Sequence, residues 1–218
     1  MKDVIMAIGA HPDDIEFGCG GTLINHKEFG DKVIYVCMTD TQSVDKTNNK
    51  VIRSHEQLKQ ETENAATILG VDELHYLPFT DLNVPFSLES VSELEKLIKQ
   101  YKVNTIYTHW SGDSNQDHIA TFKTTMAAAR YVPNVYCYEQ IPIPRHTDNP
   151  MRVNSYSDIS RTFSLKIEAS ECHKSQFEKY KKAGFDVTEN LTTLAKYRGI
   201  QANCMYAEGF QVIKQVSW

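Results

Sequence analysis

The sequence predicts an α/β fold: a Rossmann-like, three-layer α/β/α arrangement in which a mostly parallel central sheet is covered by helices on both faces. Short apolar segments alternate with longer amphipathic segments from the first residues to about residue 138. Such alternation indicates strands joined by right-handed helical crossovers, which makes the strands parallel. The apolar segments are continuous, as expected of strands buried on both faces. No low-complexity linker or internal repeat divides the chain, so we expect one domain over residues 1–218.

The first elements of this pattern surround a loop rich in polar side chains. Residues 4–10 (VIMAIGA) form a continuous apolar run and are predicted to be a buried strand. A glycine cluster follows the polar loop, and residues 22–29 carry apolar side chains before Gly30, which predicts a short helix. Residues 32–38 (KVIYVCM) are a second predicted strand, and the polar segment after it, through Lys50, is predicted to be an exposed loop.

The middle of the chain carries the clearest helical patterns. Charged residues alternate with apolar ones over residues 51–69, and Gly70 follows in the position that commonly ends a helix. Residues 87–101 have apolar side chains at a 3.6-residue period, with Ser87 as a suitable N-cap. Residues 73–77, between these two helices, are a short predicted strand.

The remaining elements continue the alternation and then become less regular. Residues 103–108 are a buried strand, 119–131 an alanine-rich helix and 134–138 another strand. Residues 141–156 contain several Pro, Arg and Asn residues and are predicted to be a long loop. Two predicted helices and a last strand complete the chain at residues 163–180, 190–201 and 207–216.

Composition and charge exclude several classes of protein. The formal net charge is -5 at pH 7 and no basic stripe is visible, which argues against a nucleic-acid partner. No apolar run approaches membrane-spanning length, and the N-terminus lacks the features of a signal peptide, so we expect a cytoplasmic protein without stable membrane insertion. Cysteines are dispersed without a CxxC pair, which is typical of reduced thiols rather than a disulfide framework.

Side chains with metal-binding chemistry follow two of the predicted strands. His11 and Asp14 are three residues apart after the first strand, and His118 follows the strand at 103–108. Ligands of open parallel sheets bind beyond the carboxyl ends of the strands, so these two segments could converge. Two imidazoles and one carboxylate leave an open position on a tetrahedral ion, which is the arrangement of a catalytic zinc site. Asp13 would lie next to the metal and could take a proton from bound water.

Each half of this pattern also has a simpler interpretation. The His-Pro-Asp-Asp segment could be a turn with an aspartate cap, and Asp117 before a helix could act only as a cap. The two segments together, at matching ends of a parallel sheet, favour a metal site. Zinc is inferred from the ligand types, and Fe2+, Co2+ or Mn2+ would also accept two histidines and one carboxylate.

The stretch AIGAHPDDIEFGCGGTL, residues 7–23, resembles the signature of the PIG-L (LmbE-like) family of zinc-dependent N-deacetylases, which act on N-acetylglucosamine-type groups. The resemblance implies His11, Asp14 and His118 as zinc ligands and Asp13 as general base. It extends over nearly the whole chain, through the segments AATILGV (65–71), QDH (116–118), DIS (158–160), SQF (175–177) and AEGF (207–210).

The same resemblance implies Arg53 and Asp81 as contacts to the sugar, although Arg53 could equally be a solvated helix charge. Arg145, His146 and Arg152, in the predicted long loop, are candidates for binding a phosphate or carboxylate of the substrate.

The chain departs from the family in its second motif. Many members have His-Pro-Asp-His where this chain has Asn-Gln-Asp-His, and the first histidine is credited with stabilising or protonating the transition state. Asn115 can donate a hydrogen bond to an oxyanion but cannot deliver a proton at neutral pH. Either Asp13 returns the proton to the leaving amine or another group such as His109 supplies it. Asp117 is expected to orient a neighbouring group of the site.

The sequence therefore predicts a metal-dependent hydrolase that removes the acetyl group from a small N-acetylated sugar. Two rivals stay open: an amidase acting on a bulkier acyl group or a thiol-conjugate amide, and a non-catalytic protein that binds a sugar or nucleotide sugar. Against a nucleotide site, the glycine cluster at 18–21 forms neither GxGxxG nor a P-loop. Members of the family are often homo-oligomers, so the resemblance leaves a homo-oligomer open for this chain.

Overall fold

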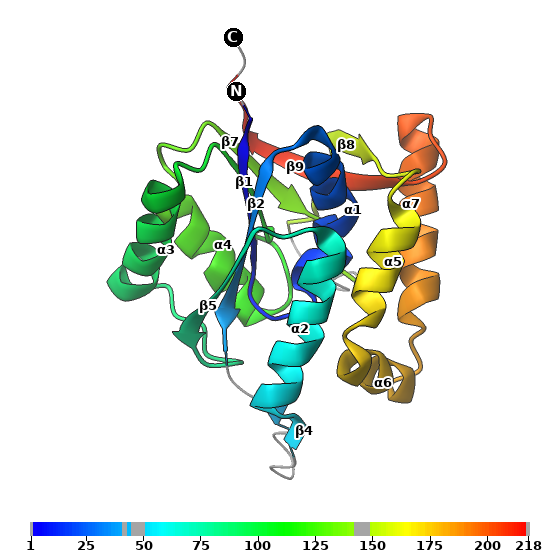
Figure 1. Cartoon of the computed structure of the whole chain (residues 1–218), viewed down its shortest axis with the longest axis horizontal. Helices are drawn as coiled ribbons and strands as arrows, with labels where there is room; N and C mark the ends of the chain where they lie inside the picture. Colours follow the sequence, from blue (N-terminus) through cyan, green and yellow to red (C-terminus); the bar gives the residue numbers. More distant parts are fainter. Residues whose placement is uncertain (1, 41–42, 45–50, 142–148, 217–218) are drawn as a thin grey trace.

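The computed structural model describes residues 2–40, 43–44, 51–141 and 149–216, which form a seven-stranded sheet with helices on both faces (Figure 1). The strands of this sheet are β1 (Val4–Gly9), β2 (Lys32–Thr39), β5 (Glu73–Phe79), β6 (Thr105–Thr108), β7 (Asn134–Tyr138), β8 (Ser155–Asp158) and β9 (Ala207–Lys214). A separate hairpin pairs β3 (Ser43–Val44) with β4 (Val51–Arg53). The helices are α1 (Asp14–Phe29), α2 (His55–Leu69), α3 (Leu88–Tyr101), α4 (Gln116–Ala128), α5 (Phe163–Glu171), α6 (Lys174–Lys182) and α7 (Val187–Ala202). The predicted fold class is confirmed.

The strand order in the sheet is β5-β2-β1-β6-β7-β9-β8. Strand β1 lies between β2 and β6, and its Ile5 pairs with Val33 on one side and Thr105 on the other. Strands β5, β2, β1, β6 and β7 are all parallel, whereas β9 runs antiparallel to both β7 and β8. The carboxyl ends of the five parallel strands therefore meet at one edge of the sheet.

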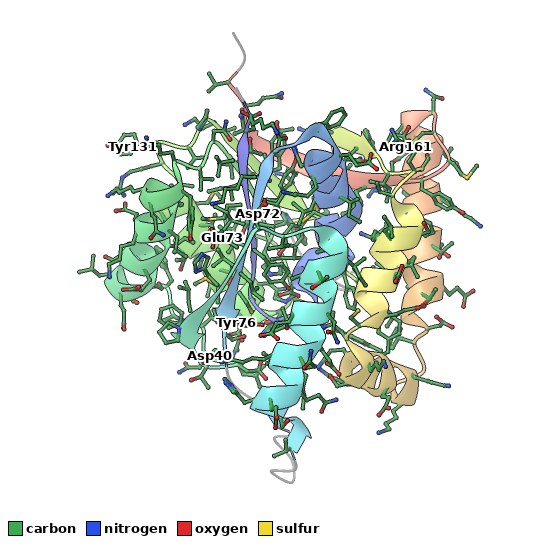
Figure 2. All side chains as sticks on the ribbon, viewed as in Figure 1. Asp40, Asp72, Glu73, Tyr76, Tyr131 and Arg161 are labelled. Atoms are coloured by element: carbon green, nitrogen blue, oxygen red, sulfur yellow. The ribbon has the colours of Figure 1, made fainter. Side chains whose placement is uncertain are left out.

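Helices α3 and α4 cover one face of the sheet, and α1, α2 and α5 lie on the other, with α6 and α7 beside them (Figure 1). Successive side chains of a strand point to opposite faces. Met6 and Ile8 of β1 accordingly join the core under α3 and α4, while Ile5 and Ala7 join the core under α1. Side chains fill both layers, and the exposed Tyr131 lies at the margin of the molecule (Figure 2). Among the described helices, none combines the length and apolar character needed to cross a membrane.

Helix α1 begins at Asp14, well before the predicted start at residue 22. The glycines at positions 18, 20 and 21 conceal this helix in the sequence, because glycine is a poor helix former. Their small size is needed for packing, since a Cβ at Gly18 would collide with the ring of Tyr138. The metal-ligating candidate Asp14 thus lies on the first turn of a helix rather than in a loop.

Three further boundaries differ from the prediction. Helix α2 starts at His55, because the Ser54 side chain accepts a hydrogen bond from the Gln57 N–H and caps it. The helix predicted over residues 163–180 is divided into α5 and α6, which a tight turn at 172–173 separates. The stretch predicted as a long loop ends in the edge strand β8, and its residues 142–148 lie outside the described part of the chain.

Candidate metal centre

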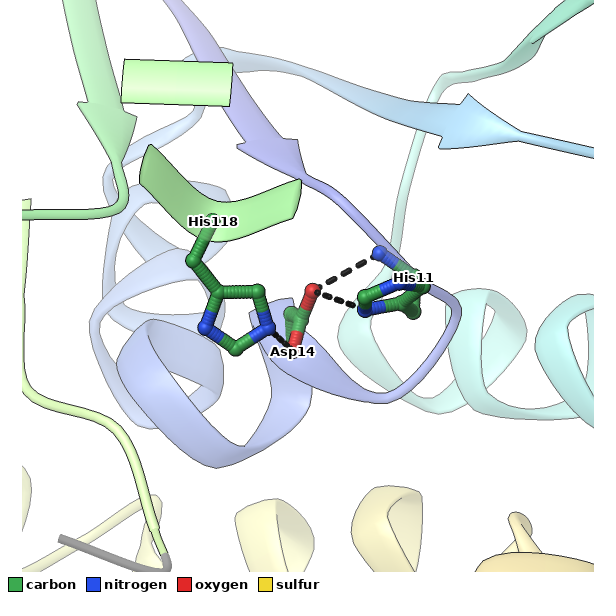
Figure 3. Close-up of side chains that lie close together, drawn as sticks. All are labelled: His11, Asp14 and His118. Carbon is green, nitrogen blue, oxygen red and sulfur yellow. Dashed lines mark hydrogen bonds and ion pairs between the residues drawn. The ribbon is translucent and has the colours of Figure 1, made fainter. Parts of the chain in front are cut away.

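His11, Asp14 and His118 come together at the carboxyl edge of the sheet, as the sequence predicts (Figure 3). His11 follows β1, Asp14 opens α1, and His118 lies on the first turn of α4. The Asp14 Oδ1 atom is 3.3 Å from His118 Nε2, and Asp14 Oδ2 is 3.6 Å from His11 Nδ1. Ligand atoms around a tetrahedral zinc ion are about 3.3 Å apart, because each bond is ~2.0–2.1 Å long. One ligand atom from each of the three side chains lies within 4.8 Å of the others, so the group could hold a metal ion.

Each of the two histidines has a carboxylate within hydrogen-bond distance of the ring nitrogen that faces away from Asp14. Asp117 Oδ2 lies 3.0 Å from His11 Nε2, which leaves Nδ1 facing Asp14. Asp113 Oδ2 lies 2.8 Å from His118 Nδ1, which leaves Nε2 facing Asp14. Carboxylates in this position fix the ring orientation and the tautomer of metal-binding histidines and make the free nitrogen more basic. The contact between Asp117 and His11 is consistent with the predicted orienting role of Asp117.

Three hydrogen bonds, from two groups, fix the position of Asp14. Its Oδ2 atom accepts a 2.7 Å hydrogen bond from the backbone N–H of His11. Gln140, which follows β7, donates through Nε2 to both Oδ1 and the backbone carbonyl of Asp14, each at 3.0 Å. Burial opposes ionisation of Asp14, but the charge of His118 lowers the pKa of this carboxyl well below its usual range. Asp14 is therefore an ionised carboxylate in a fixed orientation, as a metal ligand would need to be.

His109 lies against this group without joining the three ligands. Its ring is fully buried and stacks on His118 at 3.9 Å between ring centroids. His109 Nε2 accepts a hydrogen bond from the Ala10 N–H and lies 3.0 Å from Asp14 Oδ2. Burial and the neighbouring His118 lower the pKa of His109 to about 4. A neutral ring in this position is a poor source of a proton at neutral pH.

Asp13 occupies the N-cap position of α1 but does not use its side chain as a cap. The residue is 6% exposed, and burial together with the charge of Asp14 raises the pKa of its carboxyl to about 6. Arg53 and His173 act in the opposite direction, and both of these side chains are also buried. The pKa of the Asp13 carboxyl is thus close to neutral pH, as is suitable for a general base.

The backbone of Asp13 is strained, with φ 122° and ψ -28°. Only glycine adopts such angles readily. In the metal-free protein we expect Asp13→Gly to be more stable than Asp13→Ala by about 1–3 kcal/mol, as measured by urea unfolding. Asp186, an N-cap residue with an ordinary φ of -93°, provides the matched control. If the glycine and alanine variants differed in unfolding free energy by the same amount at positions 13 and 186, the backbone of Asp13 would not be strained.

Both histidine ligands hold protons more tightly than usual in the metal-free protein. Burial alone would lower the pKa of His118, but Asp14 and Asp113 raise it to about 9. Burial opposes the charged form of His11 as well, but hydrogen bonds to Asp117, Asp14 and Asp81 raise its pKa well above 6.5.

A metal ion must displace these two protons at neutral pH. We expect the apparent metal affinity to rise roughly 100-fold for each pH unit between about pH 6 and 8. Competition with a fluorescent chelator, corrected for the chelator's own protonation, measures this slope. A pH-independent affinity would contradict the assignment of His11 and His118 as protonated ligands.

The other predicted site residues lie around this centre in different ways. Asp81 Oδ1 is 3.2 Å from His11 Nε2, so it borders the metal ligands. The Asn115 side chain caps α4 by accepting a hydrogen bond from the Asp117 N–H at 2.8 Å. Arg53 is only 2% exposed, and its guanidinium donates to the carbonyl of Pro12 behind the Asp13 loop. Of the candidate anion-binding residues, positions 145 and 146 lie outside the described part of the chain.

Two residues that contact the ligands were missed by sequence reasoning. Asp113 lies between β6 and α4, among several polar residues with no distinctive spacing. Gln140 follows β7, another of the parallel strands whose carboxyl ends meet at the site. The rule that placed His11 and His118 could have drawn attention to both, since it applies to every parallel strand.

Proteins of similar sequence are named deacetylases. The sequence matches the family PIG-L, GlcNAc-PI de-N-acetylase, over residues 6–129. It is 34% identical over 177 residues to the uncharacterized deacetylase YaiS of Escherichia coli (strain K12), which covers 78% of this chain and 90% of that protein. It is 26% identical over 227 residues to the diacetylchitobiose deacetylase of Thermococcus kodakarensis, with 96% and 82% of the two chains covered.

A solved structure of similar shape is GalB, the 4-carboxy-2-hydroxymuconate hydratase of Pseudomonas putida KT2440. Its TM-score is 0.82 at 20% identity, with 100% of this chain and 98% of that chain covered. At this identity the likeness concerns the fold alone. The family match spans more than half of the chain, and the relatives from E. coli and T. kodakarensis are both named deacetylases. The chain belongs to the PIG-L family.

Proposed function

We propose that the protein is a zinc-dependent hydrolase that removes the N-acetyl group from a GlcNAc-type glycoside, giving a free amine and acetate. The observation that carries this proposal is the convergence of His11, Asp14 and His118 next to the buried carboxylate of Asp13. Deacetylases among the relatives, one of them acting on diacetylchitobiose by its name, support the reaction and the class of substrate.

The donor set supports a metal ion as cofactor. Two imidazole nitrogens and one carboxylate oxygen suit zinc, with Fe2+, Co2+ and Mn2+ as alternatives. A zinc ion in this position would polarise the amide carbonyl and make water nucleophilic near neutral pH. His11, Asp14 and His118 would hold it, and Asp117 and Asp113 would keep the two imidazoles turned toward it.

Asp13 is our choice for both proton transfers. With a pKa of about 6, its carboxylate can accept a proton from the attacking water at neutral pH. The same oxygen can then donate that proton to the amine nitrogen as the C–N bond breaks, so that no further acid is needed. The low pKa and complete burial of His109 favour this arrangement over the alternative in which His109 supplies the proton.

Arg53, Asn115 and Asp81 are assigned supporting roles in this proposal. The guanidinium of Arg53 favours the ionised form of Asp13 and lies too deep for a solvated surface charge. Asn115 would donate from its amide nitrogen to the developing oxyanion, since its oxygen already caps α4. Asp81, at the rim beside His11, would contact a sugar hydroxyl. A cytoplasmic location stays a prediction from the sequence, and the oligomeric state stays open.

The test is acetate release from a panel of N-acetylglucosamine glycosides, with metal-stripped protein and with the same protein after addition of zinc. We expect release only after zinc is added, and the panel then ranks the aglycones. Amides with longer acyl chains and thiol-conjugate amides complete the panel. Turnover of those substrates alone would replace deacetylation by the bulkier-acyl amidase, and stoichiometric zinc binding without any turnover would favour a sugar-binding protein.

A further inference from the structure

Helix α1 is interrupted at Cys19, where φ is -145° and ψ is 16°. The break separates a short first segment, residues 14–18, from a longer second segment, residues 20–29. The first segment carries Asp14 and follows directly on Asp13. A helical segment of five residues is unstable by itself, so contacts with other elements must hold it in place.

Glu208, on the antiparallel strand β9, supplies one of these contacts. Its carboxylate accepts hydrogen bonds from the N–H groups of Gly21 and Thr22, at 2.9 and 2.8 Å, and from the Thr22 hydroxyl at 2.5 Å. These N–H groups belong to the first turn of the second helical segment. Glu208 therefore serves that segment as a helix N-cap does, but from a distant strand.

Lys166, on α5, supplies the matching contact on the first segment. Its ammonium group donates to the carbonyl of Phe17 at 2.7 Å and to Glu208 Oε1 at 2.5 Å. The side chains of Lys166 and Glu208 are only 3% and 4% exposed. The pair thus bonds to the backbone on both sides of Cys19 and neutralises its own buried charges.

Close packing leaves little freedom at the break. A Cβ at Gly21 would lie only 2.8 Å from the Ile159 side chain, so the second segment rests directly on the residues that precede α5. The first segment rests even more closely on the ring of Tyr138, which a Cβ at Gly18 would overlap. A shift of either segment would therefore have to displace buried side chains.

We propose that the Lys166–Glu208 pair is a positioning device for the metal centre: it fixes the first segment of α1 at the angle that points Asp14 toward His11 and His118 and holds Asp13 beside them. This inference rests on the proposed function for the identity of the site. It also gives a role to the AEGF segment, whose glutamate lies on β9 away from the three ligands. Lys166 and Glu208 act through the α1 backbone and touch no reacting group.

The decisive variant is Lys166→Met combined with Glu208→Gln, because it removes both charges and leaves neither one buried alone. We expect its zinc dissociation constant to rise about 10–100-fold, the usual loss when an outer partner of a metal site is removed. We also expect kcat to fall while KM changes little. Hydrogen exchange of the metal-free variant should show weaker protection of the Phe17 amide, which bonds to the Asp13 carbonyl.

Ile98→Ala is the control for general destabilisation. Ile98 is buried in the core on the opposite face of the sheet, next to the start of β6, far from the carboxyl edge. We expect this variant to lose thermal stability but to keep the zinc affinity, kcat and Phe17 protection of the wild type. If the double variant does not fold, Glu208→Asp replaces it in the test, because aspartate keeps the charge on a shorter side chain. Zinc affinity, kcat and Phe17 protection are then measured on that variant.

The inference would be overturned if the folded double variant, or Glu208→Asp, kept the zinc affinity, kcat and Phe17 protection of the wild type. Failure of the wild-type protein to bind zinc or release acetate would instead overturn the proposed function. Phe17 protection in the metal-free proteins would still show whether the pair holds the first helical segment, so the two failures are distinguishable.

Discussion

Replacing Asp13 with asparagine is expected to lower kcat by about 10²–10⁴-fold, the usual contribution of a general base. Asparagine keeps the size of the side chain but cannot accept the proton from water. Zinc stoichiometry should stay at the wild-type value, because His11, Asp14 and His118 are unchanged. Acetate release under saturating zinc measures kcat, and a variant with wild-type turnover would remove Asp13 from the mechanism.

The same substitution should make the metal-free protein more stable at pH 7. The pKa of Asp13 is about 6 in the folded protein, above its ordinary value of 3.8, so the folded state binds the proton more tightly. Stability therefore falls as the pH rises from about 4 to about 6, and the loss is complete above that range. Removing the charge recovers up to about 3 kcal/mol, since one pKa unit corresponds to ~1.4 kcal/mol.

Urea unfolding at pH 7 and pH 4 tests this expectation, with metal removed from both proteins. At pH 7 the free energy of unfolding of the variant should be larger than that of the wild type. At pH 4 the difference between the two values should be smaller. These results would give Asp13 opposite requirements for activity and for stability, which is common at active sites. A variant less stable than the wild type at pH 7 would mean that the buried charge is better compensated than its burial suggests.

Asp14→Asn is expected to have the opposite effect on stability and to abolish metal binding. The pKa of Asp14 lies well below 3.8 in the folded protein, so its ionisation contributes stability above about pH 4 that is lost as the pH falls. Removing this charge takes away one of the two carboxylates that pair with the buried His118, the other being Asp113, so we expect a cost of up to about 3–5 kcal/mol, the usual cost of breaking a buried ion pair.

Zinc affinity should fall by more than the roughly 10–100-fold that the loss of an outer partner causes, because Asp14 is a ligand in the proposed site. The comparison is well controlled: the two variants change adjacent residues in the same way and predict opposite signs of stability change at pH 7. Metal content after dialysis and urea unfolding of the metal-free protein supply the measurements. Full zinc occupancy in Asp14→Asn would move the metal site elsewhere.

The sequence predicted the parallel strands well, because buried strands leave uninterrupted apolar runs. Residues 134–138 were predicted to be a strand and coincide with β7. Helix α1 was placed too late, because the glycines that allow close packing against Tyr138 and Ile159 also weaken the helical pattern. Tertiary contact, which the sequence pattern does not encode locally, outweighs propensity there.

The predicted ligands His11, Asp14 and His118 lie together, since the position of each follows from strand order and local spacing. The supporting side chains could not be chosen in the same way. Asp113 and Gln140 are recognised only by the atoms they contact, and many polar residues at the carboxyl edge are equally plausible in the sequence. The burial of Arg53 was also hidden, because charged residues seldom lie inside a protein.

The proposed ligands follow the adjacent strands β1 and β6, which would link metal binding to folding. Asp117, beside His118, lies 106 residues from His11 in the chain, so only a chain in which β1 and β6 have paired can hold both histidines around one ion. A bound metal ion would therefore stabilise only the folded state, by about 2.7 kcal/mol when free metal is 100 times its dissociation constant. The supply of metal in the cell would then set how long each folded molecule survives, as well as how fast it works.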